Sequence, residues 1–505
     1  MKTRSFAIAL FLASVSALGA QQPDTLVLQG VVISATKSPV ASSALTQSVT
    51  VITGEELRAR GVMSVAEALR GLPGVAVASN GSYGSLTSLF LRGGESRYTK
   101  FLVDGVPVNA VGGYFDLSHL TTDNIERIEV VRGPASAVHG ADAVAGAVQI
   151  FTRKGAGPAK VSSHLRAGTY GTVDAGLGAA GGGDRAGFSL YGARHSTDGI
   201  LPFNNDYRNE TVSGSAKVLP DAATTLSLSA RGTHAESHYP TDYAGNVVDS
   251  NAFRDQRRLT VSADARRQLR PGMELALVGG ANDVTEFTDD VTTTGTGSTR
   301  DRYTSVNRRR RAEARFALAS AMGKLTVGAE YQAERERSSS AAGPENGELS
   351  DYSSFSGRRT TRAAYAEQLA SLGRLALTLG GRVDDPSDFG SAATYRVGTA
   401  LRLRPGSTVR GSLSTAYNAP AFYHLLDTDF TTGNSSLSPE RARNFEVGAS
   451  QEVLAGLASI TASYFDQRFR ELIEYVPGGP PDYVGTYANL RGASSKGFEL
   501  ELSTA

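Results

Sequence analysis

Several features that would point to an enzyme or a nucleic-acid-binding protein are missing from this sequence. Its 505 residues include no cysteine, which excludes disulfides and any metal or nucleophile site built on thiols. Lys and Arg together number 51 and Asp and Glu 50, so no charge excess favours binding to nucleic acid. We also find no nucleophile–base motif and no phosphate-cradling loop. We therefore expect neither an enzyme nor a required cofactor.

The first 20 residues are typical of a secretory signal peptide. Lys2 and Arg4 precede a short apolar stretch, and the small residues Ala17 and Gly19 follow at the spacing that a signal peptidase prefers. A buried strand or helix is the alternative for this stretch. No later segment is apolar for long enough to form a membrane helix. An exported protein of this kind is either soluble or a β-barrel, because only helices and closed barrels satisfy their backbone in lipid.

Residues 38–155 are predicted to form a mixed α+β domain. Thr53 and Ser64 each stand three residues before a Glu, which is the capping pattern that opens a short helix. Apolar or alternating stretches predict strands at 47–52, 86–91, 100–103 and 125–132. The apolar side chains of the last strand are expected to pack against the helices.

Residues 156–505 are predicted to form a large antiparallel β-barrel that crosses a membrane. Leu226 and Leu228 share one face of a strand and Ser229 and Arg231 the other, as expected for one lipid face and one polar lumen face. Short turns such as 270–272 alternate with long polar loops predicted at 236–256, 286–307, 336–357 and 424–441. A soluble β-sandwich would explain the alternation but not the regular short and long connections. The alternation predicts about 16 or 17 strands, and because an open edge is unfavourable in lipid, we expect the native product to be longer or this chain to be a fragment.

Several motifs carry a resemblance to one family. They are the runs 88–94, 102–109, 125–137 and 146–150 in the first domain, and 416–421, 437–440, 444–448, 487–489 and 497–499 in the second. Together these motifs resemble the TonB-dependent receptors of the Gram-negative type of outer membrane. The resemblance implies a barrel of about 22 strands, here truncated, with an α+β plug domain inside its lumen. It also implies active import driven by the inner-membrane protein TonB, contact with outer-membrane lipid and lipopolysaccharide, and an N-terminus in the periplasm.

An energy-coupling segment is predicted at residues 21–37. Its centre resembles the TonB box of the family and comprises Asp24, Thr25, Leu26, Val27, Leu28, Gln29, Gly30 and Val31. A short extended apolar segment of this kind can add as a strand to the sheet edge of a partner protein. The alternative placement is 31–36, which has equal β propensity, and an ordinary linker strand is the remaining interpretation.

Within the family, the resemblance is strongest to the cobalamin transporters. It implies ligand contacts at Leu86, Ser88, Glu95, Gly113 and Tyr114, although Glu95 stands where an amide is expected and the loop at 111–116 is short. It also implies calcium in the outer loops, for which Asn205, Asp206, Asp242 and Asp249 are available. A ferric siderophore receptor is the alternative function, and a ligand-sensing signalling receptor on the same architecture is a more remote one.

Two charged groups have structural and functional interpretations. Arg92, Glu126, Glu129 and Arg132 are expected to form salt bridges within the plug or against the barrel wall. The basic run 308–311 is predicted to be a solvated strand end, with lipopolysaccharide phosphates as the alternative partner.

Overall fold

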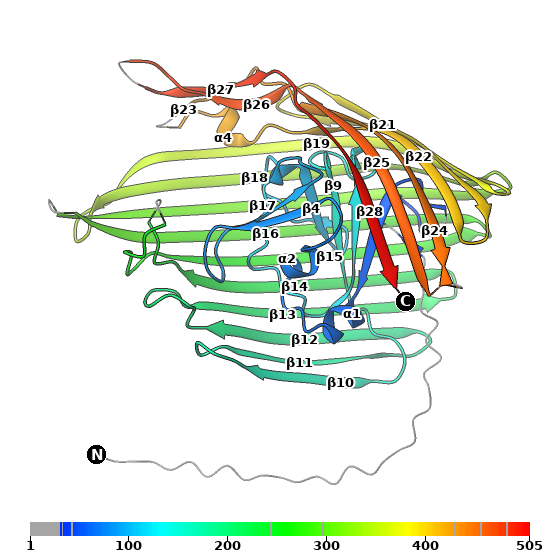
Figure 1. Ribbon diagram of the computed structural model, residues 1–505, viewed down its shortest axis with the longest axis horizontal. Helices are drawn as coiled ribbons and strands as arrows, with labels where there is room; N and C mark the ends of the chain where they lie inside the picture. The colour runs from blue at the N-terminus through cyan, green and yellow to red at the C-terminus, as the bar shows by residue number, and fades with distance from the viewer. Residues whose placement is uncertain are drawn as a thin grey trace, which may run out of the picture.

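The computed structural model describes residues 31–504 except 33, 42–43, 243–244, 295–296, 429–430, 455–456 and 481–482. The predicted signal peptide lies outside these residues. Figure 1 shows two parts, a small α+β domain near the N-terminus and a large curved sheet that surrounds it. We call the small domain the plug and the large sheet the barrel wall.

The plug begins as the capping pattern predicts. The Thr53 and Ser64 side chains each accept a hydrogen bond of 3.1 Å from the backbone N–H three residues later, which starts helices α1 (Gly54–Ala59) and α2 (Val65–Leu69). Both helices are therefore confirmed. The other elements are β1 (Val31–Val32), β2 (Val40–Ala41), β3 (Ser48–Thr53), β4 (Val75–Ser79), β5 (Thr87–Leu91), η2 (Ser96–Tyr98), β6 (Thr99–Val103), β7 (Val106–Pro107), β8 (Ile125–Arg132), α3 (Ser136–His139) and β9 (Gly146–Thr152).

A five-stranded sheet in the order β3-β8-β9-β6-β7 forms the centre of the plug. The predicted strand at 125–132 is confirmed as β8, and its residues Ile125, Ile128 and Val130 are almost completely buried in one core with Leu57 of α1 and Leu69 of α2. The two short helices therefore cover one face of this sheet. Two further pairs, β4-β5 and β1-β2, lie outside it.

The barrel wall is a 16-stranded antiparallel sheet, which agrees with the number of strands predicted from the alternation. Each strand pairs with the next along the chain except near its end, where β22 pairs with β24 and β25 with β28. The strands are β10 (Lys160–Ala167), β11 (Val173–Gly182), β12 (Ala186–Thr197), β13 (Tyr207–Asp221), β14 (Thr224–His238), β15 (Phe253–Arg270), β16 (Met273–Thr294), β17 (Gly297–Ser320), β18 (Gly323–Pro344), β19 (Ser350–Leu372), β20 (Leu375–Pro386), β21 (Ala392–Arg404), β22 (Ser407–Asn418), β24 (Glu440–Val453), β25 (Ala458–Arg470) and β28 (Ser494–Thr504).

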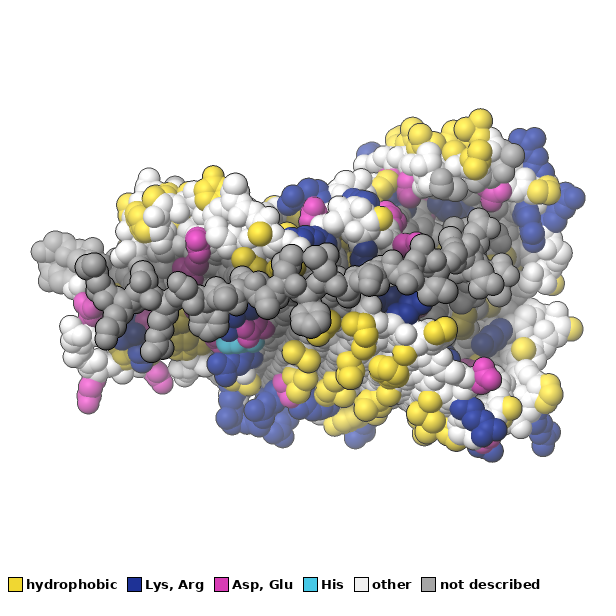
Figure 2. Space-filling model, turned by 90° about the horizontal axis from the view of Figure 1, so that it is seen from below, with side chains coloured by type: hydrophobic (Ala, Val, Ile, Leu, Met, Phe, Trp, Pro, Cys, Tyr) yellow, Lys and Arg dark blue, Asp and Glu magenta, His cyan; other side chains and the backbone are white. Residues whose placement is uncertain are grey.

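Side chains alternate across the barrel wall as predicted. In β14, Leu226 and Leu228 are exposed on the outside, whereas Ser229 and Arg231 are buried against the plug. Arg231 donates a hydrogen bond of 2.7 Å to the Asp123 carbonyl of the plug. Apolar side chains gather in patches on the outside of the molecule (Figure 2). The inner face of the sheet is therefore polar and plug-binding, and its outer face is rich in apolar side chains.

The connections differ at the two ends of the barrel wall. Tight turns such as that between β15 and β16 lie at one end, which we call the short-turn end. At the other, the hairpin end, strands β16 to β19 run on for 22 to 24 residues each. The predicted long loops at 286–307 and 336–357 are therefore wrong, because most of their residues form paired strands. About ten residues of each strand are enough to cross a membrane, so the rest of these long strands needs no apolar face. Without that face, the sequence of the extensions resembles that of a polar loop.

The predicted connections at 236–256 and 424–441 do contain long loops. The second begins inside α4 (Phe422–Leu425) and contains β23 (Thr431–Thr432). Strand β23 joins a three-stranded sheet with β26 (Leu472–Val476) and β27 (Gly485–Leu490). Figure 1 shows this small sheet beside α4, above the barrel wall. Among the described residues, no helix is both long enough and apolar enough to cross a membrane.

Candidate functional site

A cavity of about 560 Å³ lies at the hairpin end, between plug loops and the inner face of the barrel wall. Its plug side is formed by Leu86, Ser88, Ser96, 108–111 and 114–116. Strands β15 to β19 form its other side, and Tyr423 and Thr428 line it from the connection between β22 and β24. Its lining is rich in hydroxyl groups, which come from Ser88, Ser96, Tyr114, Tyr303, Ser305, Ser338, Ser340, Ser353 and Tyr423. Such a surface offers many hydrogen bonds to a polar ligand.

The plug loop under this cavity is held by one amide side chain. Asn109 accepts a hydrogen bond from the Phe101 N–H at 2.7 Å and donates to the carbonyls of Thr99 and Gly113 at 3.0 and 2.7 Å. Gly113 has a φ of 93°, and a Cβ there would lie 2.1 Å from the Arg97 carbonyl oxygen. The loop therefore requires glycine at this position, and it presents Tyr114, which is 42% exposed, toward the cavity.

Helix α4 closes one side of the cavity. Phe422 packs on Gly357 of β19, where a Cβ would lie only 2.2 Å from the Phe422 ring. The Ala421 N–H donates to His424 Nδ1 at 3.1 Å, and burial lowers the pKa of His424 to about 3, so this ring is neutral. These contacts fix the neighbouring Tyr423, whose ring centroid lies 6.4 Å from that of Tyr114.

Both arginines that line the cavity are engaged by the plug. Arg254 lies 2.8 Å from Asp116 and donates to the Gly84 carbonyl at 2.9 Å. Burial alone would raise the pKa of Asp116, but Arg254 and neighbouring donors hold it below its usual range. Arg258 donates to the Val108 carbonyl at 2.8 Å. Their guanidinium groups therefore position the plug loops.

Three of the five predicted ligand residues line this cavity. They are Leu86, Ser88 and Tyr114, and Gly113 belongs to the same loop as Tyr114. The Glu95 side chain does not line it, because it binds Arg97 at 2.6 Å, and Arg97 in turn binds Glu440 of the barrel wall at 3.0 Å.

The four predicted calcium ligands have separate partners. The Asn205 amide binds Ser82 and the Leu201 N–H, Asp242 accepts from Asn246, and Asp249 accepts from Asn251 and Ala252. Asp206 lies 2.6 Å from His238 Nδ1. Among the described residues, one set of three or more His, Asp or Glu side chains has its possible ligand atoms within 4.8 Å of one another. It comprises Asp206, Glu236 and His238 and so includes one of the four predicted ligands. Calcium binding by the predicted set stays a prediction.

The expected salt bridges between plug and barrel wall are present. Arg92 binds Glu446 at 2.6 Å and Glu499 at 2.8 Å, and Arg132 binds Glu501 at 2.9 Å. Within the plug, Glu126 and Glu129 both bind Arg127. The basic run is divided by the strand alternation: Arg309 and Arg311 face the plug and bind Glu334 and Glu330, whereas Arg308 and Arg310 are exposed. The prediction of a solvated strand end is therefore wrong for the inward half of this run.

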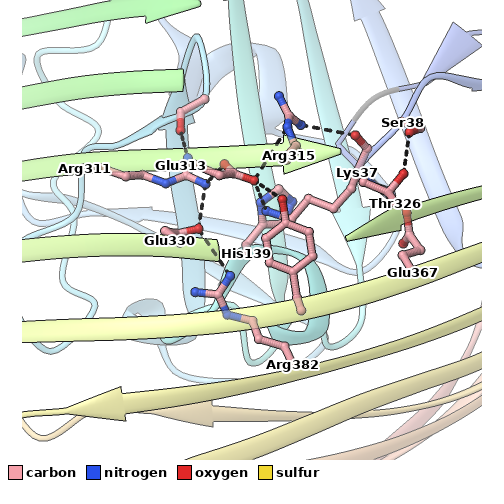
Figure 3. A network of polar contacts seen from close by, with 12 residues as sticks. Lys37, Ser38, His139, Arg311, Glu313, Arg315, Thr326, Glu330, Glu367 and Arg382 are labelled. Carbon is pink, nitrogen blue, oxygen red and sulfur yellow. Dashed lines mark hydrogen bonds and ion pairs between the residues drawn. The ribbon is translucent and has the colours of Figure 1, made fainter. Parts of the chain in front are cut away.

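A second polar network lies at the short-turn end and holds residues 34–38, which we call the latch. Each latch residue is exposed by 8% or less. Figure 3 shows Lys37 within this network, where its Nζ lies 3.1 Å from Glu313 and its N–H donates to Glu367 at 2.8 Å. Ser38 and Thr326 share a hydrogen bond of 3.0 Å. The latch therefore ties the start of the plug to strands β17, β18 and β19.

The plug also binds the latch, through a serine. Ser34 donates to Glu129 from its hydroxyl at 2.7 Å and from its N–H at 2.9 Å, and the His139 ring binds the Ser34 carbonyl at 2.7 Å. Burial, reinforced by Lys37, lowers the pKa of His139 to about 3, so the ring is neutral and donates through Nε2.

Charges on the barrel wall compensate one another around the latch. Burial lowers the pKa of Lys37 to about 8 although Glu313 opposes this effect. Arg311 binds Glu313 and Glu330, and Arg382 binds Glu330 at 3.2 Å. A cavity of about 490 Å³ lies beside Lys37 and His139. The latch is thus held by paired charges next to a cavity at the short-turn end.

Most of the predicted TonB box, residues 24–30, lies outside the described residues. Its last residue, Val31, begins β1. Strand β1 precedes the latch and pairs with β2, which follows it. The latch itself was missed by sequence reasoning because its partners lie far along the chain. The cavity residues of β18, Glu336, Ser338 and Ser340, were also missed, because every residue from 334 to 340 is polar and no alternation marks the lumen face.

Comparisons with known proteins match both parts of the chain. Residues 157–505 match the family model "TonB dependent receptor-like, beta-barrel", and residues 41–147 match "TonB-dependent Receptor Plug Domain". The vitamin B12 transporter BtuB of Vibrio vulnificus (strain YJ016) is 27% identical over 98% of this chain and 79% of its own length. The protein of the same name from Photobacterium profundum is 26% identical over 90% of this chain and 72% of its own length.

Solved structures share the fold at lower sequence identity. The structure of the FpvAI–pyocin S2 complex has a TM-score of 0.79 at 16% identity and covers 94% of this chain and 72% of that one. The siderophore receptor PirA from Acinetobacter baumannii has a TM-score of 0.71 at 20% identity and covers 90% and 78%. At these identities the likeness establishes the architecture alone.

Proposed function

Because this chain belongs to the TonB-dependent receptors, which are plugged outer-membrane transporters, we propose that the nutrient it imports is a cobalamin. The observation that carries this proposal is the hairpin-end cavity. It is lined by Leu86, Ser88 and Tyr114, three residues onto which the resemblance to cobalamin transporters puts ligand contacts. The names of the similar vitamin B12 transporters support the same nutrient.

The chemistry of the cavity also supports a corrinoid. Cobalamin carries many amide groups, and the serine and tyrosine hydroxyls of the lining can both donate to and accept from amides. The lining has two arginines, Arg254 and Arg258, and both bind the plug. A negatively charged ferric siderophore would need cations that are free to bind it. Because both arginines are bound to the plug, a ferric siderophore is the second candidate. The observation in favour of a siderophore is that three tyrosines, Tyr114, Tyr303 and Tyr423, line the cavity.

Import requires that the plug responds to the inner membrane. We propose that the N-terminus lies in the periplasm, that TonB binds residues 24–31 by strand addition, and that the pull reaches the plug through the latch. The latch follows this segment directly and binds both the plug and the barrel wall. The hairpin end then faces the outside, where its strand extensions and lipid-facing apolar patches meet lipopolysaccharide and lipid.

Titration of cyanocobalamin into the full-length protein tests the proposal. We expect saturable binding, and we expect Ser88→Ala to weaken it by up to about a hundredfold, because an unpaired polar group of the ligand costs roughly 1–3 kcal/mol. Ser371→Ala, at an exposed serine of β19 near the short-turn end, is the matched control and should leave binding unchanged. Absence of saturable binding would remove cobalamin and leave a ferric siderophore as the better candidate.

A further inference from the structure

One carboxylate in the hairpin-end cavity lacks the partner that a buried charge normally has. Glu336 of β18 lines the cavity and is 8% exposed. Within the described part of the chain it forms no ion pair, and its Oε2 accepts no hydrogen bond. Burying a carboxylate in this way is costly unless a donor compensates it.

A second acceptor without a partner lies on the neighbouring strand, directly opposite this carboxylate. Asn307 of β17 is the register partner of Glu336 and lines the same cavity. Its Nδ2 donates to Ser305 Oγ at 3.1 Å, and its buried Oδ1 has no hydrogen-bond partner among the described residues. The amide N–H of Asn307 is thus bound to a neighbouring side chain of the barrel wall, and its carbonyl oxygen remains available to accept a hydrogen bond.

The neighbouring cations are already bound to other groups. Arg309 donates to Glu334 at 3.1 Å, and Arg359 donates to Asp388 at 2.8 Å. The two arginines that line the cavity bind the plug, as described above. The cavity therefore presents two buried acceptors side by side, and the arginines around them are engaged elsewhere.

We propose that Glu336 and Asn307 form a subsite that binds N–H groups of the transported ligand. The matching chemistry is a primary amide or an ammonium group, on a ligand that is neutral or positively charged. A carboxylate or catecholate oxygen at this position would meet two acceptors, and a like charge where Glu336 is ionised, so the same pair disfavours polyanionic iron chelates. The subsite would select the ligand in the cavity that we propose for cobalamin. It rests on the proposed function only for the identity of that ligand.

Two pairs of probes test the subsite with the full-length protein. The first pair is cyanocobalamin and its derivative in which one corrin amide is a carboxylate. The second pair is the cationic ferrioxamine B and the anionic ferric enterobactin. Wild type should prefer the uncharged or cationic member of each pair by about ten- to a hundredfold. Glu336→Gln should reduce that preference about tenfold, and Asn307→Asp should increase it.

Glu452→Gln, at an exposed glutamate of the short-turn end, is the matched control and should change neither preference. If cyanocobalamin does not bind but ferrioxamine B is preferred and Glu336→Gln weakens that preference, the subsite stands and the cobalamin proposal fails. If cyanocobalamin binds and neither variant alters discrimination, the subsite is wrong and the cobalamin proposal stands. Binding of no probe, or equal binding of both members of each pair, overturns the subsite.

Discussion

The two ends of the barrel wall differ in how the buried charges on its inner face are compensated. At the short-turn end, Lys37 of the latch binds Glu313, and Arg311 and Arg382 bind Glu330. At the hairpin end, Glu336 is equally buried and has no ion-pair partner among the described residues. The same barrel wall thus pairs its buried charges where the plug must be held and leaves a buried carboxylate without an ion pair where a ligand is expected to enter. Paired buried charges hold a contact in place, whereas unsatisfied buried acceptors are suited to an incoming donor.

The largest effect should follow from breaking a latch ion pair. Glu313→Ala leaves Lys37 buried without its carboxylate, which should destabilise the plug–barrel contact by about 3–5 kcal/mol. We expect faster protease cleavage near residues 34–38 and a lower unfolding midpoint in denaturant. Glu56→Ala, which breaks an exposed ion pair with Arg60, is the control and should cost less than about 1 kcal/mol. Equal effects of the two substitutions would contradict the special role of the latch.

A smaller effect should appear in the pH dependence of stability. The pKa of Lys37 is lowered from 10.5 to about 8, so between these values the unfolded chain binds the proton that the folded protein has lost. Stability should therefore rise with pH across this window, by up to about 3 kcal/mol. The difference in unfolding free energy between wild type and Lys37→Met isolates this contribution. A difference that stays constant from pH 8 to pH 10.5 would show that Lys37 is not buried as described.

The smallest effect concerns the wall of the ligand cavity. Gly357→Ala should push Phe422 away and cost about 1–3 kcal/mol through overpacking, because the new Cβ would lie 2.2 Å from the ring. Tyr423 should move with it, and cyanocobalamin binding should weaken several-fold. Gly381→Ala, where a Cβ meets nothing within 4 Å, is the control. Unchanged binding in the Gly357 variant would mean that α4 does not shape the site.

The sequence was sufficient for local features and insufficient for long-range ones. The capping residues Thr53 and Ser64, strand β8 and the alternation in β14 were predicted correctly because each depends on neighbouring residues. The extended hairpins were predicted as loops because strands that project into water lose the apolar face that identifies them. The latch could not be predicted from the sequence because its ion-pair partners, Lys37 and Glu313, are separated by 276 residues. Glu336 lies in one of the predicted loops, so its inward orientation became clear only from the register with Asn307.

Import of cobalamin driven through the N-terminal segment is tested most directly by one comparison. Cyanocobalamin binding and cellular uptake are measured for the full-length protein and for Leu26→Pro, in which proline removes a backbone donor and restricts the residue before it. We expect unchanged binding and abolished uptake in the variant. Uptake at the wild-type rate would contradict the placement of the TonB box at residues 24–31, and absence of binding in both proteins would contradict cobalamin as the nutrient.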